Sequence, residues 1–236
     1  MQPKNSQTLA ELAQQLTKVV CVGRNYAAHA AELNNPVPDE PVLFIKPSSA
    51  VVPWSKQVAI PCDRGECHHE LELAFLIGQR LTKASRDDCL NAIAGVTLAL
   101  DLTLREEQSK LKQQGKPWEL AKAFDGACPI AAWEPLDNIL SCSKGEANSS
   151  DLDLSCLAEV SIELKVNDKL CQAGQVRDMI WQPLDLIAHI SQFFTLNPGD
   201  VVLTGTPAGV SSMELGDKLS ASLNGQVVIE SEVVYA

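Results

Sequence analysis

The chain has 236 residues, of which 45% are hydrophobic and 21% are charged, proportions typical of a globular protein with a sizeable core. Its formal net charge of −11 argues against nucleic acid or an anionic membrane as a partner, because both attract basic surfaces. The eight cysteines form no CxxC pair and no apolar stretch reaches transmembrane length, so we expect a reduced, cytoplasmic protein.

The first third of the chain predicts short elements. The polar segment 1–17 lacks the apolar run of a signal peptide and predicts a helix. The run KVVCVG (18–23) predicts a buried strand, the Ala-rich 25–33 a short helix, and PVLFIKP (41–47) a strand stopped by its final proline.

The middle of the chain predicts longer elements. These are a strand at 70–78, a helix at 84–94, a buried strand at 92–102 that overlaps the helix, and an exposed charged helix at 105–114. Ser85 opens the first helix and Gly115 ends the second.

The last hundred residues predict mainly strands. The expected elements are a surface loop at 135–153, a hairpin at 161–172, an amphipathic helix at 185–195, a strand at 201–207 and a final hairpin at 219–235. Asn167-Asp168 and Asn224-Gly225 supply the two hairpin turns. Because strands dominate and do not alternate regularly with long helices, the pattern favours a mostly β, α+β fold.

Two glutamates at the start of an apolar run, in ECHHELELAFLIG (66–78), suggest a metal site. Along a strand Glu70 and Glu72 point to the same side, and neighbouring carboxylates repel each other unless a cation lies between them. Asp101 ends the apolar run AGVTLAL and is a third candidate ligand; oxygen ligands suit Mg²⁺ or Mn²⁺ better than zinc. The alternative is a solvent-facing edge strand, with Asp101 capping a turn.

Other metal-ligand patterns are weaker. His68 has the same strand parity as the two glutamates and is a further candidate ligand. A zinc site from Cys62, Cys67 and a histidine is conceivable, although the spacing matches no standard pattern. The segment TGTPAG (204–209) offers either backbone N–H groups and a hydroxyl to an oxyanion, or a plain turn.

A second cluster lies near the N-terminus. His29 and Glu32 share a face of the predicted helix, and a carboxylate beside an imidazole makes the ring a better base; the alternative is an ordinary surface pair. Arg24, Lys46 and Lys122 stand in mostly uncharged surroundings. They either face an anionic substrate or lay their apolar stems along the surface at strand ends.

Six segments, in order, resemble the fumarylacetoacetate hydrolase superfamily, most closely its single-domain branch of acylpyruvate hydrolases and oxaloacetate decarboxylases. They are CVGRNYAAHAAEL, EPVLFIKP, HHELELAFLIG, ALDLTLREEQ, GKPWELAKAFDGACP and GDVVLTGTPAGV, and they span the chain from Cys21 to Val210. The resemblance implies a rolled, mostly β mixed sheet in one catalytic domain over 18–236, assembled as a homodimer.

The resemblance also implies the roles of individual residues. Those matched are Glu70, Glu72 and Asp101 as ligands of Mg²⁺ or Mn²⁺; His29, Glu32 and Lys122 in catalysis; and Arg24, Gln108 and Thr206 at the substrate's carboxylate and oxo groups. The segment with His29 is implied to order as a lid over bound ligand. We add Lys46 to the substrate-binding residues, as a cation facing an anionic substrate.

The implied reaction is the Mg²⁺-dependent hydrolysis of a carbon–carbon bond in a 2,4-dioxo acid, such as fumarylpyruvate or acetylpyruvate. His29 activates water, and the metal and Lys122 stabilise the pyruvate enolate that leaves. The alternatives are an oxaloacetate decarboxylase, an isomerase or hydratase of unsaturated 2-oxo diacids, and a catalytically silent protein that binds metal and small acids. Two departures from the family pattern are Ser211, where glycine is common, and a long polar loop at 141–153, which leaves open which substrates enter.

Overall fold

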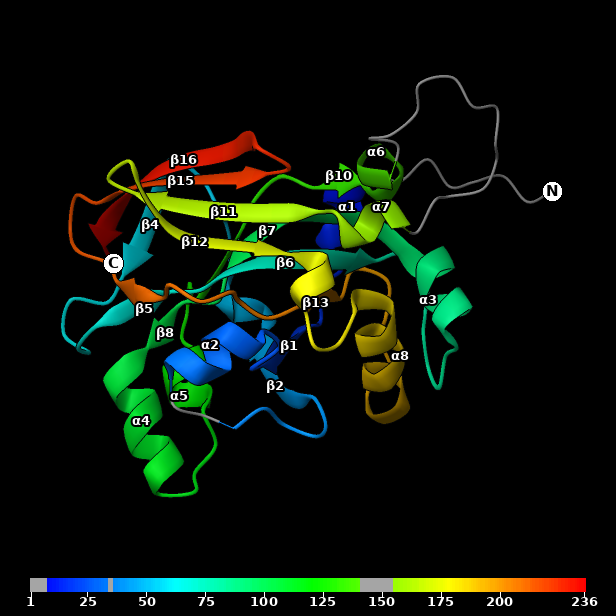
Figure 1. Cartoon of the computed structure of the whole chain (residues 1–236), viewed down its shortest axis with the longest axis horizontal. Coiled ribbons are helices and arrows are strands. Elements are labelled where there is room, and N and C mark those ends of the chain that lie inside the picture. Colours follow the sequence, from blue (N-terminus) through cyan, green and yellow to red (C-terminus); the bar gives the residue numbers. More distant parts are fainter. Residues whose placement is uncertain (1–7, 34–35, 141–154) are drawn as a thin grey trace.

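The computed structural model describes residues 8–33, 36–140 and 155–236 (Figure 1). Its largest sheet runs in the order β2 (Val42–Pro47), β1 (Lys18–Gly23), β13 (Val201–Leu203), β6 (Leu71–Ile77), β7 (Ile93–Leu100), β9 (Cys128–Ile130) and β3 (Val51–Pro53), with β10 (Glu134–Pro135) beside β7. The sheet is mixed, because β1 pairs with β13 and β3 with β9 in parallel while the other pairs are antiparallel. The predicted mostly β, α+β fold with a curled mixed sheet is confirmed.

The centre of this sheet is covered on both faces. Every residue of β6 is buried, and β7 is buried over nearly its whole length. One face packs into the main hydrophobic cluster, around Phe75 and Leu98, and the other into a smaller cluster around Leu76 and Ala99. A near-continuous apolar sequence is what a strand buried on both faces requires, so LELAFLI and IAGVTLAL lie at the core.

Two smaller sheets complete the strand arrangement. One runs in the order β12 (Lys169–Gln175), β11 (Ser161–Val166), β15 (Lys218–Leu223), β16 (Gln226–Tyr235) and β4 (Gln57–Ile60); the other in the order β14 (Ser211–Ser212), β5 (Cys67–His69) and β8 (Thr103–Leu104). Asn167, Asp168, Asn224 and Gly225 all have positive φ, the geometry of the tightest hairpin turns. Both predicted hairpins are therefore confirmed.

The helices are short and lie around the sheets. They are α1 (Leu9–Ala13), α2 (Ala27–Glu32), α3 (Arg86–Ala92), α4 (Arg105–Gln113), α5 (Glu119–Lys122), α6 (Leu136–Leu140), α7 (Ser155–Ala158) and α8 (Pro183–Phe193), with 3₁₀ turns at Ser48–Ala50 and Val176–Asp178. Figure 1 shows α2, α4 and α5 gathered at one end of the strands and α3 with α8 at the other. No helix in the described ranges is long and apolar enough to cross a membrane.

Element boundaries follow local chemistry. Ser85 caps α3 in a capping box with Asp88, as the predicted start requires. The predicted overlap between helix and strand is absent, because α3 ends at Ala92 and β7 starts at the next residue. The prediction of a loop from 135 was wrong over its first residues: β10 and α6 occupy them, since Leu136 and Ile139 bury their side chains in the core. The rest of that predicted loop, 141–153, lies outside the described residues.

Candidate active site

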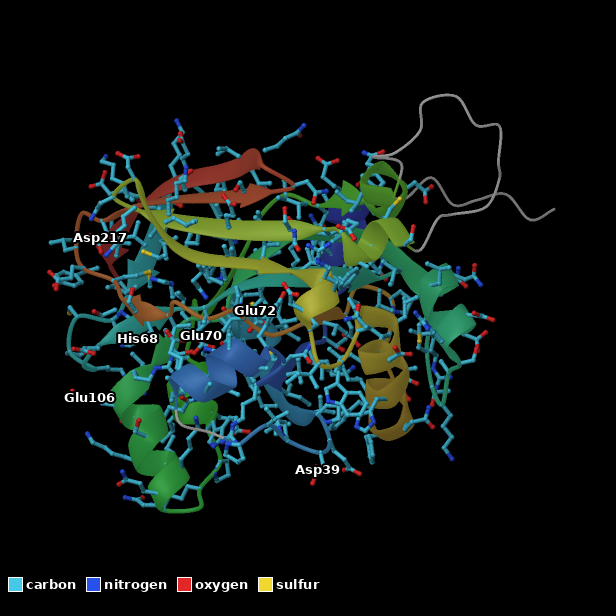
Figure 2. The ribbon with its side chains drawn as sticks, viewed as in Figure 1. Asp39, His68, Glu70, Glu72, Glu106 and Asp217 are labelled. Carbon is cyan, nitrogen blue, oxygen red and sulfur yellow. The ribbon has the colours of Figure 1, made fainter. Side chains whose placement is uncertain are left out.

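Three buried carboxylates meet where two neighbouring strands of the central sheet end. Glu70 lies in the break between β5 and β6, and Asp101 directly follows β7. Because β6 and β7 are antiparallel, with Leu71 opposite Leu100, these two ends are adjacent, and the Asp101 N–H donates to the Glu70 carbonyl over 2.8 Å. With Glu72, carboxylate oxygens of all three residues lie within 4.8 Å of one another. Figure 2 shows Glu70 and Glu72 near the middle of the molecule.

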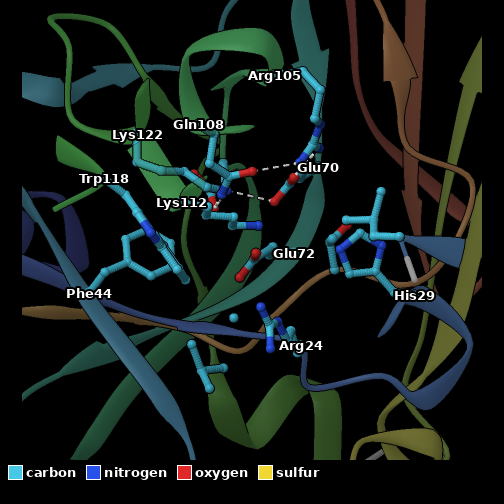
Figure 3. Close-up of a pocket in the computed structure, with 15 residues that line it drawn as sticks. Arg24, His29, Phe44, Glu70, Glu72, Arg105, Gln108, Lys112, Trp118 and Lys122 are labelled. Atoms are coloured by element: carbon cyan, nitrogen blue, oxygen red, sulfur yellow. Dashed lines mark hydrogen bonds and ion pairs between the residues drawn. The ribbon is translucent and has the colours of Figure 1, made fainter. Parts of the chain in front are cut away.

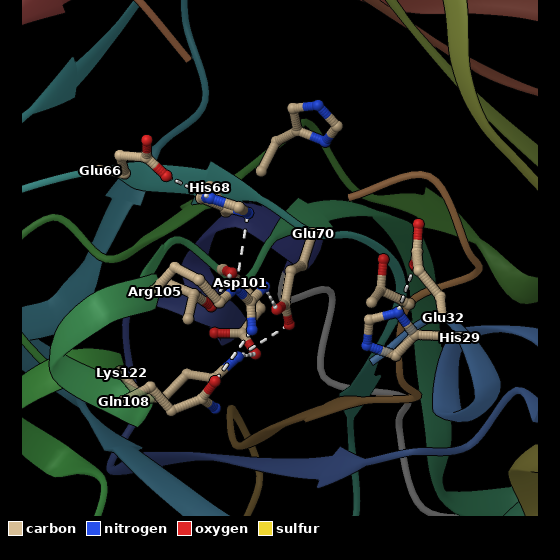
Figure 4. Close-up of polar contacts among 12 residues, drawn as sticks. His29, Glu32, Glu66, His68, Glu70, Asp101, Arg105, Gln108 and Lys122 are labelled. Atoms are coloured by element: carbon tan, nitrogen blue, oxygen red, sulfur yellow. Dashed lines mark hydrogen bonds and ion pairs between the residues drawn. The ribbon is translucent and has the colours of Figure 1, made fainter. Parts of the chain in front are cut away.

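Protein cations neutralise two of the three carboxylates. Lys122 Nζ lies 2.8 Å from Glu70 Oε2 and 2.5 Å from Asp101 Oδ2, and Arg105 pairs with the other Glu70 oxygen (Figure 4). Lys46 Nζ lies 2.7 Å from Asp101 Oδ1. Glu72 differs, because among the described residues no cation pairs with it. From that part of the chain its Oε2 accepts one hydrogen bond, from the Gly205 N–H over 2.6 Å.

The pKa shifts follow this distribution of charge. Burial raises the pKa of Glu72 well above its usual value, and the negative charges of Asp101 and Glu70 raise it further. Burial acts to raise the pKa of Glu70 as well, but the positive charges of Lys122 and Arg105 outweigh it and lower the pKa of that carboxyl. Burial lowers the pKa of Lys122, but Asp101 and Glu70 outweigh it and raise it overall, so the amine stays protonated.

This arrangement fits a divalent cation. Glu72 is an uncompensated carboxylate beside two others, and an isolated buried charge is costly unless a counter-charge joins it. A set of carboxylate oxygens alone is the donor set of Mg²⁺ or Mn²⁺. The residues predicted as metal ligands are thus together and suitably placed.

The predicted proton-transfer pair lies on the other side of the same cavity. His29 is buried on α2, and its Nδ1 lies 3.2 Å from Glu32 Oε2. Glu32 is oriented in turn by the Gly209 N–H, which donates to its Oε1 over 3.0 Å. With Nδ1 turned to the carboxylate, His29 Nε2 remains to accept a proton. Figure 3 shows His29 across the cavity from Lys122, with Glu72 between them.

Arg24, Gln108 and Thr206 also line the cavity, as expected for substrate-binding residues. Arg24 follows β1 with a φ of 62°, in the left-handed region. Its neighbour Asn25 holds this turn, since Asn25 Nδ2 donates to the Thr204 carbonyl over 2.8 Å. Gln108 is buried on α4 and accepts from Arg105 Nη1 over 2.9 Å.

Lys46 does not line the cavity, so its expected contact with substrate does not fit its position. The side chain is fully buried, and its Nζ donates to the Ala127 carbonyl over 3.1 Å and to the Lys122 carbonyl while it pairs with Asp101. All of its donors face protein. Its position behind Asp101 suits an orienting role for that carboxylate.

The other predicted metal patterns do not assemble. His68 bonds to Glu66, with Nε2 3.3 Å from the carboxylate, and is not part of the carboxylate group. Of the candidate zinc thiols, Cys62 is exposed and Cys67 is buried. Within the described ranges, the glutamate–aspartate group is the only set of three or more residues placed to hold a metal.

The sequence interpretation missed two cations of the cavity, Arg105 and Lys112. Burial lowers the pKa of Lys112 to about 8, helped by the positive charges of Arg24, Arg105 and Lys122. The Lys112 ammonium lies 5.1 Å from the ring centre of Trp118, another lining residue (Figure 3). Helical spacing could have identified them. Positions 105, 108 and 112 lie on one face of α4, so the assignment of Gln108 to substrate binding also placed Arg105 and Lys112 towards the substrate.

Known proteins resemble this chain over nearly its whole length. Residues 18–234 match the family model described as fumarylacetoacetate (FAA) hydrolase C-terminal. The chain is 47% identical over 210 residues to oxaloacetate tautomerase YcgM of Escherichia coli, which covers 89% of this chain and 90% of the relative.

Two crystal structures have the same fold. One, from Oleispira antarctica and assigned to the fumarylacetoacetate isomerase/hydrolase group, is 47% identical with a TM-score of 0.83 and covers 94% of each chain. The other is fumarylpyruvate hydrolase from Pseudomonas aeruginosa in complex with Mn²⁺ and pyruvate. It is 32% identical with a TM-score of 0.81, and covers 94% of this chain and 91% of the other.

Proposed function

This chain belongs to the fumarylacetoacetate hydrolase family, and we propose that it is a divalent-metal-dependent enzyme that interconverts the keto and enol forms of oxaloacetate. The observation that carries the proposal is geometric: a buried carboxylate group and His29, which is paired with Glu32, face each other across one cavity. The 47% identity to an oxaloacetate tautomerase supports oxaloacetate as the substrate. Oxaloacetate thus takes precedence over the expected 2,4-dioxo acids.

The cavity suits a small dianionic 2-oxo acid. Arg24 and Lys112 supply positive charge for the two carboxylates, and Gln108 offers an amide to the oxo group. A divalent cation held by Glu70, Glu72 and Asp101 would polarise the carbonyl oxygen and stabilise the negative charge that develops on it.

The protein's own groups carry the proton. His29 Nε2 takes a proton from the carbon next to the carbonyl, and the C–H electron pair moves into the new C=C bond while the carbonyl oxygen gains negative charge. The same ring then returns a proton to that oxygen, which completes the enol. Glu32 orients the ring and stabilises its cationic form, and the Lys122 ammonium adds positive charge beside the carboxylates.

The test begins with oxaloacetate enriched in its enol form. We expect metal-stripped protein to leave the decay of the enol ultraviolet absorbance at its spontaneous rate, and Mg²⁺ or Mn²⁺ to accelerate it without releasing pyruvate. His29→Ala should lower the accelerated rate by about 100-fold or more, the usual contribution of a general base. If pyruvate forms at the same rate as the absorbance changes, the enzyme is a decarboxylase. If the metal-bound protein does not accelerate the decay, oxaloacetate is rejected as the substrate.

A second candidate is hydrolysis of an acylpyruvate, the activity first implied by the sequence. It is favoured by the same His29–Glu32 pair, which suits activation of water as well as carbon acid chemistry. The relative from Pseudomonas aeruginosa is named a fumarylpyruvate hydrolase. Acetylpyruvate and fumarylpyruvate, followed by loss of enol absorbance and formation of pyruvate, test this candidate in the same assay.

A further inference from the structure

The strand β6, which carries Glu72 and directly follows Glu70, lacks a strand partner on one side where it meets the cavity. On that side β6 pairs with β13 only over residues 74–76. At Leu73 the Thr204 N–H still donates to the carbonyl over 3.1 Å, and beyond this point side chains take over the bonding. Thr204 Oγ1 donates to the Leu73 carbonyl over 2.9 Å, Thr206 Oγ1 donates to the Leu71 carbonyl over 2.8 Å, and Gln172 Oε1 accepts the Leu71 N–H over 2.9 Å. Both backbone groups of Leu71, the residue between the two glutamates, are therefore held by side chains.

These side chains belong to one buried chain of hydrogen bonds whose direction is fixed. Because the Leu71 N–H must donate, the Gln172 atom that it meets is the oxygen, and His69 Nδ1, 2.9 Å from that oxygen, must also donate. With Nδ1 donating, the other nitrogen of the neutral ring, Nε2, accepts from Ser211 Oγ over 2.8 Å. The Gln172 amide then donates to Thr206 Oγ1 over 2.7 Å.

We call Ser211, His69, Gln172 and Thr206 the Leu71 clamp. His69 and Gln172 are fully buried, and Thr206 nearly so. The clamp leaves no free hydroxyl hydrogen on Thr206, because that hydrogen is given to the Leu71 carbonyl. Although Thr206 lines the cavity, its hydroxyl is therefore not available to donate to the carboxylate or oxo group of a substrate.

The clamp also controls the loop that bears Thr206. Gln172 Nε2 makes a second bond, to the Pro207 carbonyl over 2.9 Å, and so holds this loop at two consecutive residues. The same loop supplies the Gly205 N–H to Glu72 and the Gly209 N–H to Glu32. A shift of the loop would therefore move a carboxylate on each side of the cavity.

We propose that Ser211, His69 and Gln172 are positioning residues that act through Thr206 and Leu71 to set the Glu70 and Glu72 carboxylates for a divalent cation. The hydroxyl of Thr206 serves this purpose, and substrate binding falls to Arg24, Lys112 and Gln108. The inference rests on the metal centre of the proposed function, but not on which substrate is turned over.

The test compares two substitutions at one position. Thr206→Val keeps the shape of the side chain and removes the hydroxyl, whereas Thr206→Ser keeps the hydroxyl. Titration of metal-free protein with Mn²⁺ by calorimetry should show an affinity about tenfold weaker in Thr206→Val, the lower end of what partners of metal ligands contribute. Thr206→Ser should stay within about twofold of the unsubstituted protein.

Kinetics separate this role from direct substrate binding. At saturating Mn²⁺ the clamp predicts that Thr206→Val keeps a KM for oxaloacetate near that of the unsubstituted protein. If the hydroxyl instead binds substrate, KM rises at every metal concentration and the Mn²⁺ affinity is unchanged, which overturns the proposal. If oxaloacetate is not turned over at all, the Mn²⁺ titrations still test the clamp.

A second pair of variants guards against misfolding of Thr206→Val. Ser211 is exposed, so Ser211→Ala removes the outer bond of the clamp with little risk to the core. It should weaken Mn²⁺ binding by about threefold, the worth of one modest hydrogen bond. Ser212→Ala, on the same strand β14, is the control and should have no effect.

Equal Mn²⁺ affinity in the two alanine variants would refute the chain of bonds as a positioning device. Absence of Mn²⁺ binding in the unsubstituted protein would refute both the metal centre and the clamp.

Discussion

Glu72 sets the electrostatic state of the site. Glu70 and Asp101 have ion-pair partners within the protein, whereas in the described part of the chain Glu72 has only a backbone N–H. Its raised pKa comes first from burial and then from Asp101 and Glu70. A proton and a divalent cation therefore compete for the same carboxylate.

This competition predicts a pH dependence of metal binding. The protonated form of Glu72 does not bind a cation, and a raised pKa extends that form to higher pH, so the Mn²⁺ affinity should fall as the pH is lowered. Calorimetric titration at a series of pH values measures it. Glu72→Gln should bind Mn²⁺ weakly at every pH and lose about 100-fold or more of metal-dependent activity, while its circular dichroism is unchanged. Strong binding by Glu72→Gln would contradict the assignment of this ligand.

The charge state of Lys112 leads to a prediction about how the cavity recognises a dianionic substrate. Its pKa, lowered to about 8 by burial and neighbouring cations, means that the ammonium is charged below that pH and neutral above it. The KM for oxaloacetate should therefore rise as the pH passes through about 8. Lys112→Arg should remove this rise because the guanidinium stays charged. Lys112→Met should raise KM by about tenfold for oxaloacetate and much less for a 2-oxo monoacid, as measured by initial rates. An equal change for both acids would exclude a role for Lys112 at the second carboxylate.

At the scale of the elements, an interrupted strand explains what the sequence could and could not predict. Glu70 and Glu72 reach the same site, as strand parity predicted. His68 has the same parity but lies on β5, whose partners are β14 and β8 in a different sheet. Parity does not extend across the break at Glu70, so His68 is separate from the carboxylate group. A single sequence gives no sign of that break, because β5 and β6 lie one residue apart.

At other elements too, a residue's role could be predicted only where it depends on local sequence and not on a buried partner from a distant segment. The hairpins were predictable because Asn167 and Gly225 mark turns by local preference alone. The role of Lys46 was not, because its partner Asp101 is brought to it by the sheet and by no local pattern. For the same reason the resemblance to a family identified the residues of the site, while their partners needed the structure.

The junction of β1 and β13 yields a prediction about stability. Asp200, just before β13, is buried, which raises its pKa, but bonds from the Asn197 N–H, Lys18 and Thr17 outweigh burial and lower it overall. A carboxylate with a lowered folded pKa stabilises the fold above its unfolded pKa of about 4 and loses that contribution as the pH falls through the folded value. Asp200→Asn should cost about 2 kcal/mol near neutral pH and less in acid, measured by urea unfolding. A cost that grows towards low pH would contradict this linkage.

At the scale of the whole molecule, ion pairs of Lys122, Lys46 and Arg105 hold the site together without a metal. Removal of the metal should therefore leave the circular dichroism unchanged and lower only the melting temperature. Mn²⁺ at about 100 times its Kd should add about 2.7 kcal/mol, which for a chain of this size raises Tm by about 5–10 °C. Glu72→Gln should show no such rise, and a rise of equal size in that variant would indicate binding elsewhere.

The homodimer implied by the family resemblance stays a prediction, which analytical ultracentrifugation can test.

The parallel pairing of β1 with β13 joins Val19 to Val201, so the central sheet closes only once the chain has been synthesised as far as Leu203. On the ribosome, both glutamates and Asp101 emerge long before Gly205, whose N–H holds Glu72. A nascent chain that ends before this loop has its ligands but not the groups that orient them. Contacts so distant in sequence form slowly. A metal centre at these carboxylates would accordingly be completed only after the Gly205 loop has been synthesised and has folded against Glu72.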